Sequence, residues 1–388
     1  MPRIIGTNVR RAAAAIASPI QRILAIEAAS GIVLLVATAA ALIWANVWTA
    51  SYRELWHTQL QQPLEFWVND GLMTVFFFVV GLEIRREISD GALASIKQAA
   101  LPLAAAVGGM LVPAGIFAAS NIGRAGAAGW GVPMATDIAF AVGVLTLLGP
   151  RIPPGLRILL LALAVVDDIG AIVVIAVFYS AGIDITGFAI VGAGISAVLV
   201  MRAAGVRAPL LYLLPGVVVW VGFVVMGIHP AIGGVVLGLI IASPVERLIH
   251  VLHPWVAFVV MPIFALANAG VVVGDARFSG DYVWLFAGIV AGLALGKPLG
   301  ITAASLAASR AGVAARAEDI TRRGVLLVGL VGGIGFTMSL FIAQLAFPPG
   351  PLLDTAKLAI LVGSGVASVV GLAFGLVTST AASRADRP

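Results

Sequence analysis

The sequence predicts an all-α, polytopic membrane protein, and three observations support this. Hydrophobic residues make up 61% of the 388 residues and charged residues only 11%, whereas about a quarter of a typical soluble domain is charged. Apolar runs of about twenty residues, long enough to cross a bilayer as helices, recur from Ile23 to Val377. Only short polar breaks separate these runs, so we expect a single integral domain.

Twelve transmembrane segments are predicted from these runs. Their limits are 23–47, 62–82, 97–119, 131–149, 157–179, 185–202, 208–225, 229–243, 254–273, 282–308, 324–346 and 357–377. The chain is thereby divided into an N-terminal segment (1–22), a 12-helix domain (23–377) and a tail (378–388). The basic N-terminal segment is interpreted as an interfacial helix, because the apolar run after it is too long for a cleavable signal.

The positive charges indicate the orientation. With the N-terminus inside, eighteen of the 23 lysines and arginines lie in cytoplasmic segments, four lie outside and one, Lys297, lies within a segment. This asymmetry follows the positive-inside rule and predicts that both termini are cytoplasmic. Aromatic residues gather around the first outer loop, from Trp48 to Gln61, as they do at membrane interfaces. The loop is compatible with a short hairpin or with a plain loop.

Four charged residues lie near the middle of predicted segments. Asp167 and Asp168 occupy the centre of "ILLLALAVVDDIGAIVVIAVFY", Lys297 lies in "LALGKPLG", and Asp137 lies in "VPMATDIAFAVG". Each such charge opposes membrane insertion by about 2.5–3.5 kcal/mol. These groups therefore need a partner, water or an ion.

The paired aspartates indicate proton-coupled chemistry. Adjacent helical residues point about 100° apart, so one carboxylate can pair with Lys297 while the other lines a cavity. Two nearby carboxylates also repel each other, which favours a bound proton that a cation can replace. The alternative is a structural ion pair between an aspartate and Lys297. One lysine cannot neutralise three aspartates, so negative charge remains for protons or a cation.

Two segments have the pattern of broken helices. Asp137 follows Gly131 and Pro133 in segment four, and segment eleven reads "VGLVGGIGFTMSLF". A break exposes helix ends, whose dipoles an acid and a lysine can compensate, and Asp137 and Lys297 suit these two roles. The alternative for the glycines is close helix packing. Segments three to five and ten to twelve would form an inverted repeat, which is typical of secondary transporters.

The candidate ligands for an ion are all oxygens. They are the carboxylates of Asp167 and Asp168, the hydroxyl of Thr136 and carbonyls freed by the break. Such a set suits an alkali cation such as Na⁺ or Li⁺, with K⁺ left open, whereas imidazole or thiolate would suggest a transition metal. The chain has no cysteine, which excludes thiolate sites and disulfides.

A second charged group lies at the predicted cytoplasmic edge. It consists of Glu83, Arg86 and Glu87 in "GLEIRREI" and of Glu246, Arg247, His250 and His253 in "SPVERLIHVLHPW". These residues form either solvated helix ends with local ion pairs or a pH-responsive cluster, since histidine titrates near neutrality. His229, in "MGIHPAIGG", begins a short segment and is compatible with an interfacial position.

Several function classes are disfavoured. The sequence lacks the "GxxxxGK[ST]" phosphate loop of ATP-driven pumps and the "HExxH" and "GxSxG" patterns of hydrolases. We therefore expect no enzyme activity, no cofactor and no nucleic-acid partner. An ion gradient is the expected energy source.

The motifs "ATDIAFA", "VVDDIGAI" and "GKPLGI" closely resemble the NhaA-type Na⁺/H⁺ antiporters of bacterial inner membranes. The resemblance includes "VNDGLMTVFFFVVGLEIRRE", "GIHPAIGG", "HVLHPWVAF", "LANAGV" and "GGIGFTMSLFIA", and it spans nearly the whole chain in order. It implies twelve helices, crossed breaks in segments four and eleven, and a cytoplasmic funnel that ends at the paired aspartates.

The resemblance also implies electrogenic exchange of cytoplasmic Na⁺ or Li⁺ for more external H⁺, in sodium and pH homeostasis. Asp167 and Asp168 would be the site carboxylates, Thr136 and Asp137 would lie at the first break, and Lys297 would pair with Asp167 when no cation is bound. A homodimer would form through the outer loop from Trp48 to Gln61.

The family's pH-sensing region matches at Glu83, Arg86, Glu87 and His229 and departs at Glu246 and Ile249. Since Ile249 cannot titrate, we expect alkaline activation to be shifted or weakened. The alternatives to the antiporter are a proton-gated cation channel and an antiporter of altered cation preference.

Overall fold

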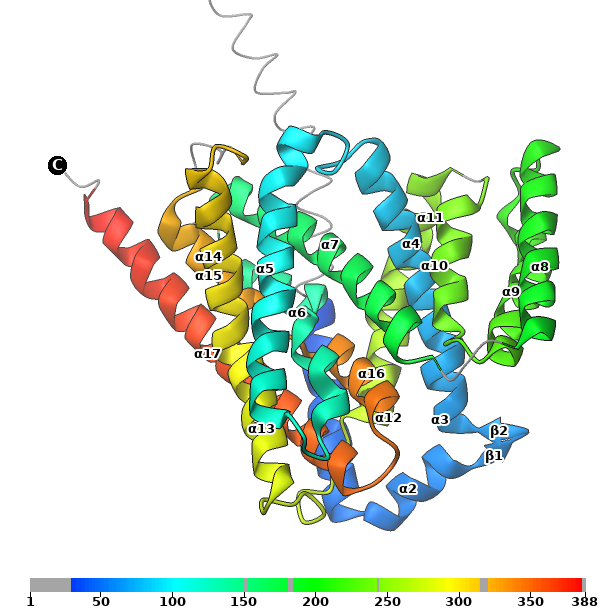
Figure 1. The fold of residues 1–388 in the computed structure, drawn as a ribbon, viewed down its shortest axis with the longest axis horizontal. Coiled ribbons are helices and arrows are strands. Elements are labelled where there is room, and N and C mark those ends of the chain that lie inside the picture. The colour runs from blue at the N-terminus through cyan, green and yellow to red at the C-terminus, as the bar shows by residue number, and fades with distance from the viewer. Residues whose placement is uncertain (1–28, 150–151, 181–183, 243, 315–319, 386–388) are drawn as a thin grey trace, which may run out of the picture.

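The computed structural model describes residues 29–149, 152–180, 184–242, 244–314 and 320–385. The predicted N-terminal segment, 1–22, lies outside these residues. Within them the chain is almost entirely helical (Figure 1). The last helix, α17 (Pro351–Ala385), continues into the region predicted as a tail.

Nine helices of the described residues are long and apolar enough to cross a membrane, and the chain is a multi-pass membrane protein. These spans are Ala29–Val47, Leu64–Ser89, Ile96–Asn121, Pro154–Phe178, Ile185–Ala203, Pro209–Met226, Val245–Asn268, Asp281–Arg310 and Pro351–Thr378. The helices within them are α3 (Leu64–Phe66), α4 (Met73–Ser89), α5 (Ile96–Asn121), α7 (Pro154–Phe178), α8 (Ile185–Ala203), α9 (Leu213–Met226), α11 (Val245–Trp255), α12 (Met261–Asn268), α13 (Asp281–Ala291), α14 (Lys297–Arg310) and α17.

Two further helix pairs are bent at a short break. The 3₁₀ helix η2 (Ala127–Met134) and α6 (Ile138–Leu147) meet at 42°, and α15 (Arg322–Gly332) and α16 (Phe336–Ala346) meet at 47°. Both breaks fall in the two segments whose glycine and proline pattern predicts them. The number of spans rises to as many as eleven if each pair is one span. A shorter apolar helix, α10 (Ala231–Ile240), packs against α4 and α9.

One face of the molecule, here called the hairpin face, carries α2 (Thr49–His57) and a two-stranded hairpin, at the bottom of Figure 1. Strands β1 (Gln59–Leu60) and β2 (Gln62–Pro63) pair antiparallel, and Gln61 between them has a φ of 68°. The sequence left a hairpin or a plain loop open here. The structure has the hairpin and, before it, a helix that buries Tyr52 and Trp56.

Close helix crossings depend on glycine where two backbones meet. A side chain on Gly300 of α14 would overlap the carbonyl of Gly108 on α5, and one on Gly234 of α10 would overlap that of Thr74 on α4. Small residues at such crossings let helices approach within membranes. The α5–α14 crossing matters for the site of the buried charges, because it lies one turn from Lys297.

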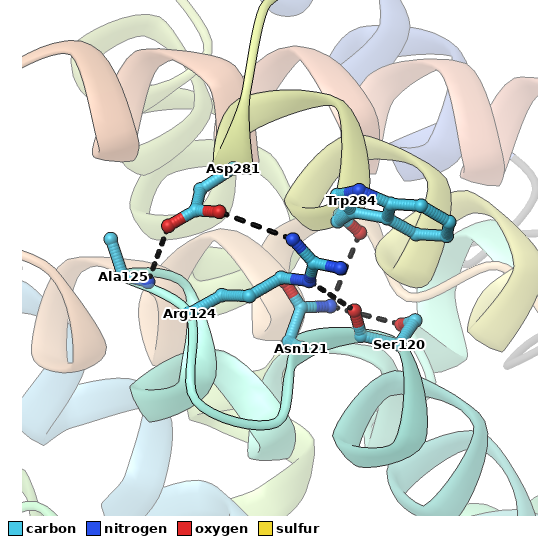
Figure 2. A network of polar contacts seen from close by, with 6 residues as sticks. All are labelled: Ser120, Asn121, Arg124, Ala125, Asp281 and Trp284. Atoms are coloured by element: carbon cyan, nitrogen blue, oxygen red, sulfur yellow. Dashed lines mark hydrogen bonds and ion pairs between the residues drawn. The ribbon is translucent and has the colours of Figure 1, made fainter.

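A polar network joins α5 to α13 near the hairpin face (Figure 2). Asn121, fully buried, donates from Nδ2 to the Trp284 carbonyl at 3.1 Å. Arg124 pairs with Asp281 at 3.3 Å and lies 4.7 Å over the Trp284 ring, while the Ala125 N–H donates to Asp281. The network closes the end of the α5 helix against the start of α13.

Three of the spans contain a π-helical turn in their described residues. They are η1 (Trp67–Leu72), η5 (Val256–Val260) and η6 (Gly292–Gly296). Such turns are frequent at functional sites, because an inserted residue rotates the next turn of the helix. The turn η6 ends directly before Lys297, the first residue of α14. A short 3₁₀ turn, η4 (Pro209–Tyr212), leads into α9.

Candidate functional site

The two adjacent aspartates of α7 have separate surroundings. Both are buried, with 1% of Asp167 and 2% of Asp168 exposed. Asp167 faces α14, where its Oδ2 lies 2.5 Å from the Lys297 ammonium. Asp168 faces a cavity of about 560 Å³. This is the arrangement that the 100° step of the α-helix predicts for neighbouring residues.

The Thr136 hydroxyl completes the contact between Asp167 and Lys297. It accepts a hydrogen bond from the Lys297 ammonium at 2.6 Å. Its single proton is shared between Asp167 Oδ2 at 2.6 Å and the carbonyl of Gly332 at 3.0 Å. Thr136 lies in the break between η2 and α6, and Gly332 ends α15, so this hydroxyl links the two broken helices to the ion pair.

One oxygen of this group is left without a partner. Asp167 Oδ1 is buried and accepts no hydrogen bond from the described residues. The carboxylate of Asp168 lines the cavity and forms no hydrogen bond or ion pair with the described residues. Uncompensated carboxylate oxygens in a buried site are costly, which a bound proton or cation relieves. The site is therefore suited to hold one or the other.

Asp137 lies where the two broken helices cross. Its Oδ1 accepts from the Phe140 N–H at 3.0 Å at the start of α6. Its Oδ2 accepts from the Thr337 N–H at 3.0 Å and from the Thr337 hydroxyl at 2.5 Å, at the start of α16. The Asp137 N–H also donates to the Ile334 carbonyl at 2.7 Å. The Asp137 carboxylate thus caps the N-termini of two helices, whose dipoles favour negative charge.

Lys297 compensates a helix C-terminus only through Thr136. The side chain is fully buried, and its hydrogen bonds within the described residues go to Asp167 and to Thr136, which in turn binds the last carbonyl of α15. Breaking a buried pair of this kind leaves an uncompensated charge and costs about 3–5 kcal/mol. Lys297 therefore holds α7, α14 and the first break together.

The cavity extends from the site to the face opposite the hairpin face. Thr136, Asp137, Asp168 and Thr337 lie at its inner end. Its wall also holds predicted residues of the charged cluster, namely Glu83, Arg86, Glu87, Glu246, His250 and His253. His253 Nε2 lies 4.0 Å from Glu83, and Arg86 lies 3.4 Å from Glu87. Ile249, buried, contributes an apolar part of this wall.

Two residues predicted with that cluster lie elsewhere. Arg247 is exposed and does not line the cavity. His229 lies at the start of α10, where its Nε2 is 3.3 Å from Asp70 and its ring stands edge-on to Phe341 at 4.9 Å. The sequence interpretation did not single out Asp70, although "VND" places this acid at the start of an apolar segment.

Two further residues of the crossing were not identified from sequence. Thr337 binds Asp137 through both its N–H and its hydroxyl, and the Ser364 hydroxyl of α17 accepts from the Phe336 N–H at 3.1 Å. Thr337 follows "GGIG", and a hydroxyl directly after a helix break is a recognisable N-terminal signal. Ser364 lies within an unbroken apolar helix, where no local pattern distinguishes it.

Two crossed broken helices, a buried acid at their meeting point and a buried carboxylate open to a cavity define an ion-coupled secondary transporter. The sequence matches the family described as Na⁺/H⁺ antiporter 1 over residues 21–374. The chain belongs to this family.

Individual relatives agree with this assignment over nearly their whole length. The chain is 49% identical to the Na⁺/H⁺ antiporter NhaA 2 of Sorangium cellulosum, over 94% of this chain and 91% of that protein. It is 46% identical to the Na⁺/H⁺ antiporter NhaA 2 of Myxococcus xanthus, over 95% and 92%. It is 45% identical to the Na⁺/H⁺ antiporter NhaA of Cupriavidus necator, over 93% and 90%. All three are named as transporters and none as an enzyme.

Proposed function

We propose that this Na⁺/H⁺ antiporter exchanges cytoplasmic Na⁺ or Li⁺ for external protons, and that more protons enter than cations leave. The observation that carries the proposal is the split between the two aspartates. Asp168 presents a carboxylate to the cavity, while Asp167 is held by Lys297 and keeps a free Oδ1. The site thus offers one carboxylate at once and a second one when the ion pair opens.

The proposed coupling is competition for these oxygens. A cation entering the cavity displaces the proton from Asp168 and uses Asp167 and Thr136 as further oxygen ligands, which suits Na⁺ or Li⁺. The Asp167–Lys297 pair then opens, and a proton leaves from Asp167 or from Lys297. A site with bare charges is too costly to cross the low-dielectric barrier, so the site changes its exposure only with cation or protons bound.

Asp137 and Thr337 would keep the crossing intact while the site changes its exposure. Both oxygens of the Asp137 carboxylate accept hydrogen bonds, one from the N-terminus of α6 and the other from the N-terminus of α16. Its proposed role is therefore electrostatic. It holds two positive helix ends beside the cation path.

The proposed architecture has twelve spans. The bent pairs count as one span each, and α10, which packs against two spanning helices, counts as the twelfth. The similar breaks at the two bent pairs support an inverted repeat of segments three to five and ten to twelve. The proposed location is the bacterial inner membrane, with both termini and the cavity mouth in the cytoplasm and the hairpin face outside.

A homodimer through the hairpin face is also proposed. Strands β1 and β2 form a sheet of only two strands, and Leu60 and Trp48 are 57% and 62% exposed. An unpaired strand edge can add strands from a second copy. The loop from Trp48 to Gln61 would thus form the contact.

For the charged cluster we propose a role in the pH response. The residues that carry it are Glu83, Arg86, Glu87, Glu246, His250 and His253, with Arg247 and His229 acting from outside the cavity. The presence of Ile249 in the cavity wall supports a response that is weaker or shifted.

The rival is a proton-gated cation channel that uses the same buried acids. One experiment separates the two and also measures charge movement. Purified protein is reconstituted in liposomes with a pH gradient, and lumenal pH is followed as Na⁺, Li⁺ or K⁺ is added, with and without an imposed membrane potential. The proposal expects alkalinisation by Na⁺ and Li⁺ that depends on the potential. Cation flux without proton movement would favour the channel, and exchange indifferent to the potential would exclude electrogenic coupling.

A further inference from the structure

A second cavity of about 650 Å³ lies on the hairpin face, away from the cation site. Three segments form its wall. They are α2 with the start of α3, the loop from Gly270 to Arg277, and the start of α17. The backbone N–H of Arg277 donates to the Thr355 hydroxyl at 3.2 Å, which ties the loop to α17. Contacts between these segments therefore hold the walls of the cavity in place.

Lys357 is the unusual residue of this cavity. It lies about two turns into α17, and only 8% of it is exposed, yet it lines the cavity. Among the described residues its ammonium has no hydrogen bond and no ion pair. Glu65 and Asp354 act on it only at longer range. A buried ammonium without acceptors is costly, so the position implies an acceptor that enters the cavity.

A second donor lies in the same wall. Trp56 is 6% exposed and lines the cavity, and its Nε1–H forms no well-aligned hydrogen bond with the described residues, the Tyr52 hydroxyl being its near neighbour. Buried indole N–H groups usually find a partner. The N-terminus of α17, at Pro351, adds positive dipole to the same region, which Asp354 in the first turn of α17 partly offsets. Three features thus favour an oxyanion on this side of the cavity.

The charges of the wall exclude a simple anion or a simple cation. Its arginines and lysine are Arg53, Arg277 and Lys357, and its acids are Glu65, Asp275 and Asp354. Arg53 and Asp275 neutralise each other at 2.5 Å. The charges that remain are the cations of Arg277 and Lys357 and the carboxylates of Glu65 and Asp354. An anion alone would be repelled by the carboxylates, and a cation alone by Lys357 and Arg277.

We propose that this cavity binds a zwitterion with an ammonium group and a phosphate, of the phosphoethanolamine type. The phosphate accepts from Lys357 and Trp56, and the ammonium lies between Glu65 and Asp354. Tyr52 lies in the same wall, and an aromatic ring beside the ammonium would add a cation–π attraction. The source is either a lipid headgroup or a free small molecule. Tyr52 stands edge-on to Trp44 at 5.6 Å and to Trp56 at 6.2 Å, an aromatic group typical of headgroup depth.

The test uses the full chain, purified in a nonionic detergent and freed of lipid. Thermal unfolding and calorimetric titration are measured with phosphoethanolamine, and with inorganic phosphate and ethanolamine as its separate halves. The variants are Lys357→Met, which keeps the apolar stem, and Trp56→Phe, which keeps a ring. Matched controls are Lys97→Met and Trp255→Phe, whose side chains are exposed elsewhere.

Phosphoethanolamine should raise the unfolding temperature more than either half, and Lys357→Met should lower its affinity at least about tenfold, with a smaller loss for Trp56→Phe. The controls and Asp168→Asn should bind normally, which separates this site from transport. If only phosphatidylethanolamine nanodiscs, compared with phosphatidylcholine nanodiscs, stabilise the protein in a Lys357-dependent way, the source is a lipid. Equal stabilisation by inorganic phosphate alone would overturn the proposal. The absence of any effect of phosphoethanolamine and of phosphatidylethanolamine nanodiscs would also overturn it. Should Lys357→Met not fold, unchanged affinity in Trp56→Phe and Asp354→Asn would overturn it as well.

Discussion

The ammonium of Lys297 lies 2.5 Å from Oδ2 of Asp167, and both side chains are almost completely excluded from solvent. This contact joins the middle of α7 to the first residue of α14, directly after the π-helical turn η6. Breaking a buried pair of this kind by removing one partner is strongly destabilising. In the proposed exchange, the opening of this pair makes a second carboxylate available.

Replacing Lys297 with glutamine should therefore destabilise the protein. The variant leaves the Asp167 carboxylate buried without a counter-charge, which costs about 3–5 kcal/mol. We expect a clearly lower unfolding temperature in detergent and a recovery of most of the loss in the double variant Lys297→Gln, Asp167→Asn. If the single and double variants unfold at the same temperature, the ion pair is not what the lysine contributes.

Asp137 should be needed for the geometry of the crossing. Asp137→Asn keeps one acceptor oxygen but removes the charge that serves the N-termini of α6 and α16, at a cost of about 2 kcal/mol. Unfolding temperature and apparent Na⁺ affinity in liposomes should both fall. Ser364→Ala is the matched change, since Ser364 makes one neutral bond to α16. It should have the smaller effect on Na⁺ affinity, and the reverse order would contradict the electrostatic role.

The crossing of α5 and α14 should not tolerate a larger residue. A methyl group on Gly300 overlaps the carbonyl of Gly108, so Gly300→Ala should push α14 away and move Lys297 from Asp167, at a cost of about 1–3 kcal/mol. Exchange activity should fall severalfold. Gly115→Ala, on α5 where nothing lies within 4 Å, is the control and should be neutral or stabilising. Equal behaviour of the two variants would mean that this crossing does not position the site.

Introducing a titratable group at Ile249 should change the pH dependence. Ile249→Glu adds a carboxylate to the cavity wall that holds Glu83 and His253. Additional negative charge holds protons in the cavity to higher pH, so the midpoint of the activity profile should move toward alkaline pH by of order one unit at low salt. Ile249→Gln, with the same length and no charge, should keep the original midpoint. A shift in both variants would point to packing rather than charge.

The sequence predicted those parts of the site that depend on local geometry. The separation of Asp167 from Asp168 follows from the helical step, and the breaks before Ile138 and Phe336 follow from glycine and proline in apolar runs. An ion pair between one of the two aspartates and Lys297 followed from the need to neutralise buried charge, and its assignment to Asp167 came from the family resemblance.

The remaining parts depend on contacts between distant segments. Thr337 and Ser364 become helix-capping partners only because α16 crosses α6 and packs on α17, which no local pattern records. The Asn121 network in Figure 2 likewise requires α13 beside the end of α5. The polar loop before the hairpin formed a helix because Tyr52 and Trp56 are buried there, with Tyr52 donating to the carbonyls of Leu266 and Ala267.

The variant Asp168→Asn tests whether protons and cations compete at the carboxylate of Asp168. Na⁺-dependent alkalinisation of acid-loaded liposomes is compared between the original protein, this variant and Asp90→Asn, an exposed acid at the end of α4. We expect Asp168→Asn to abolish the response in a protein that still unfolds cooperatively, while Asp90→Asn leaves the response unchanged. A Na⁺ response that persists in Asp168→Asn would show that protons and cations do not compete at Asp168.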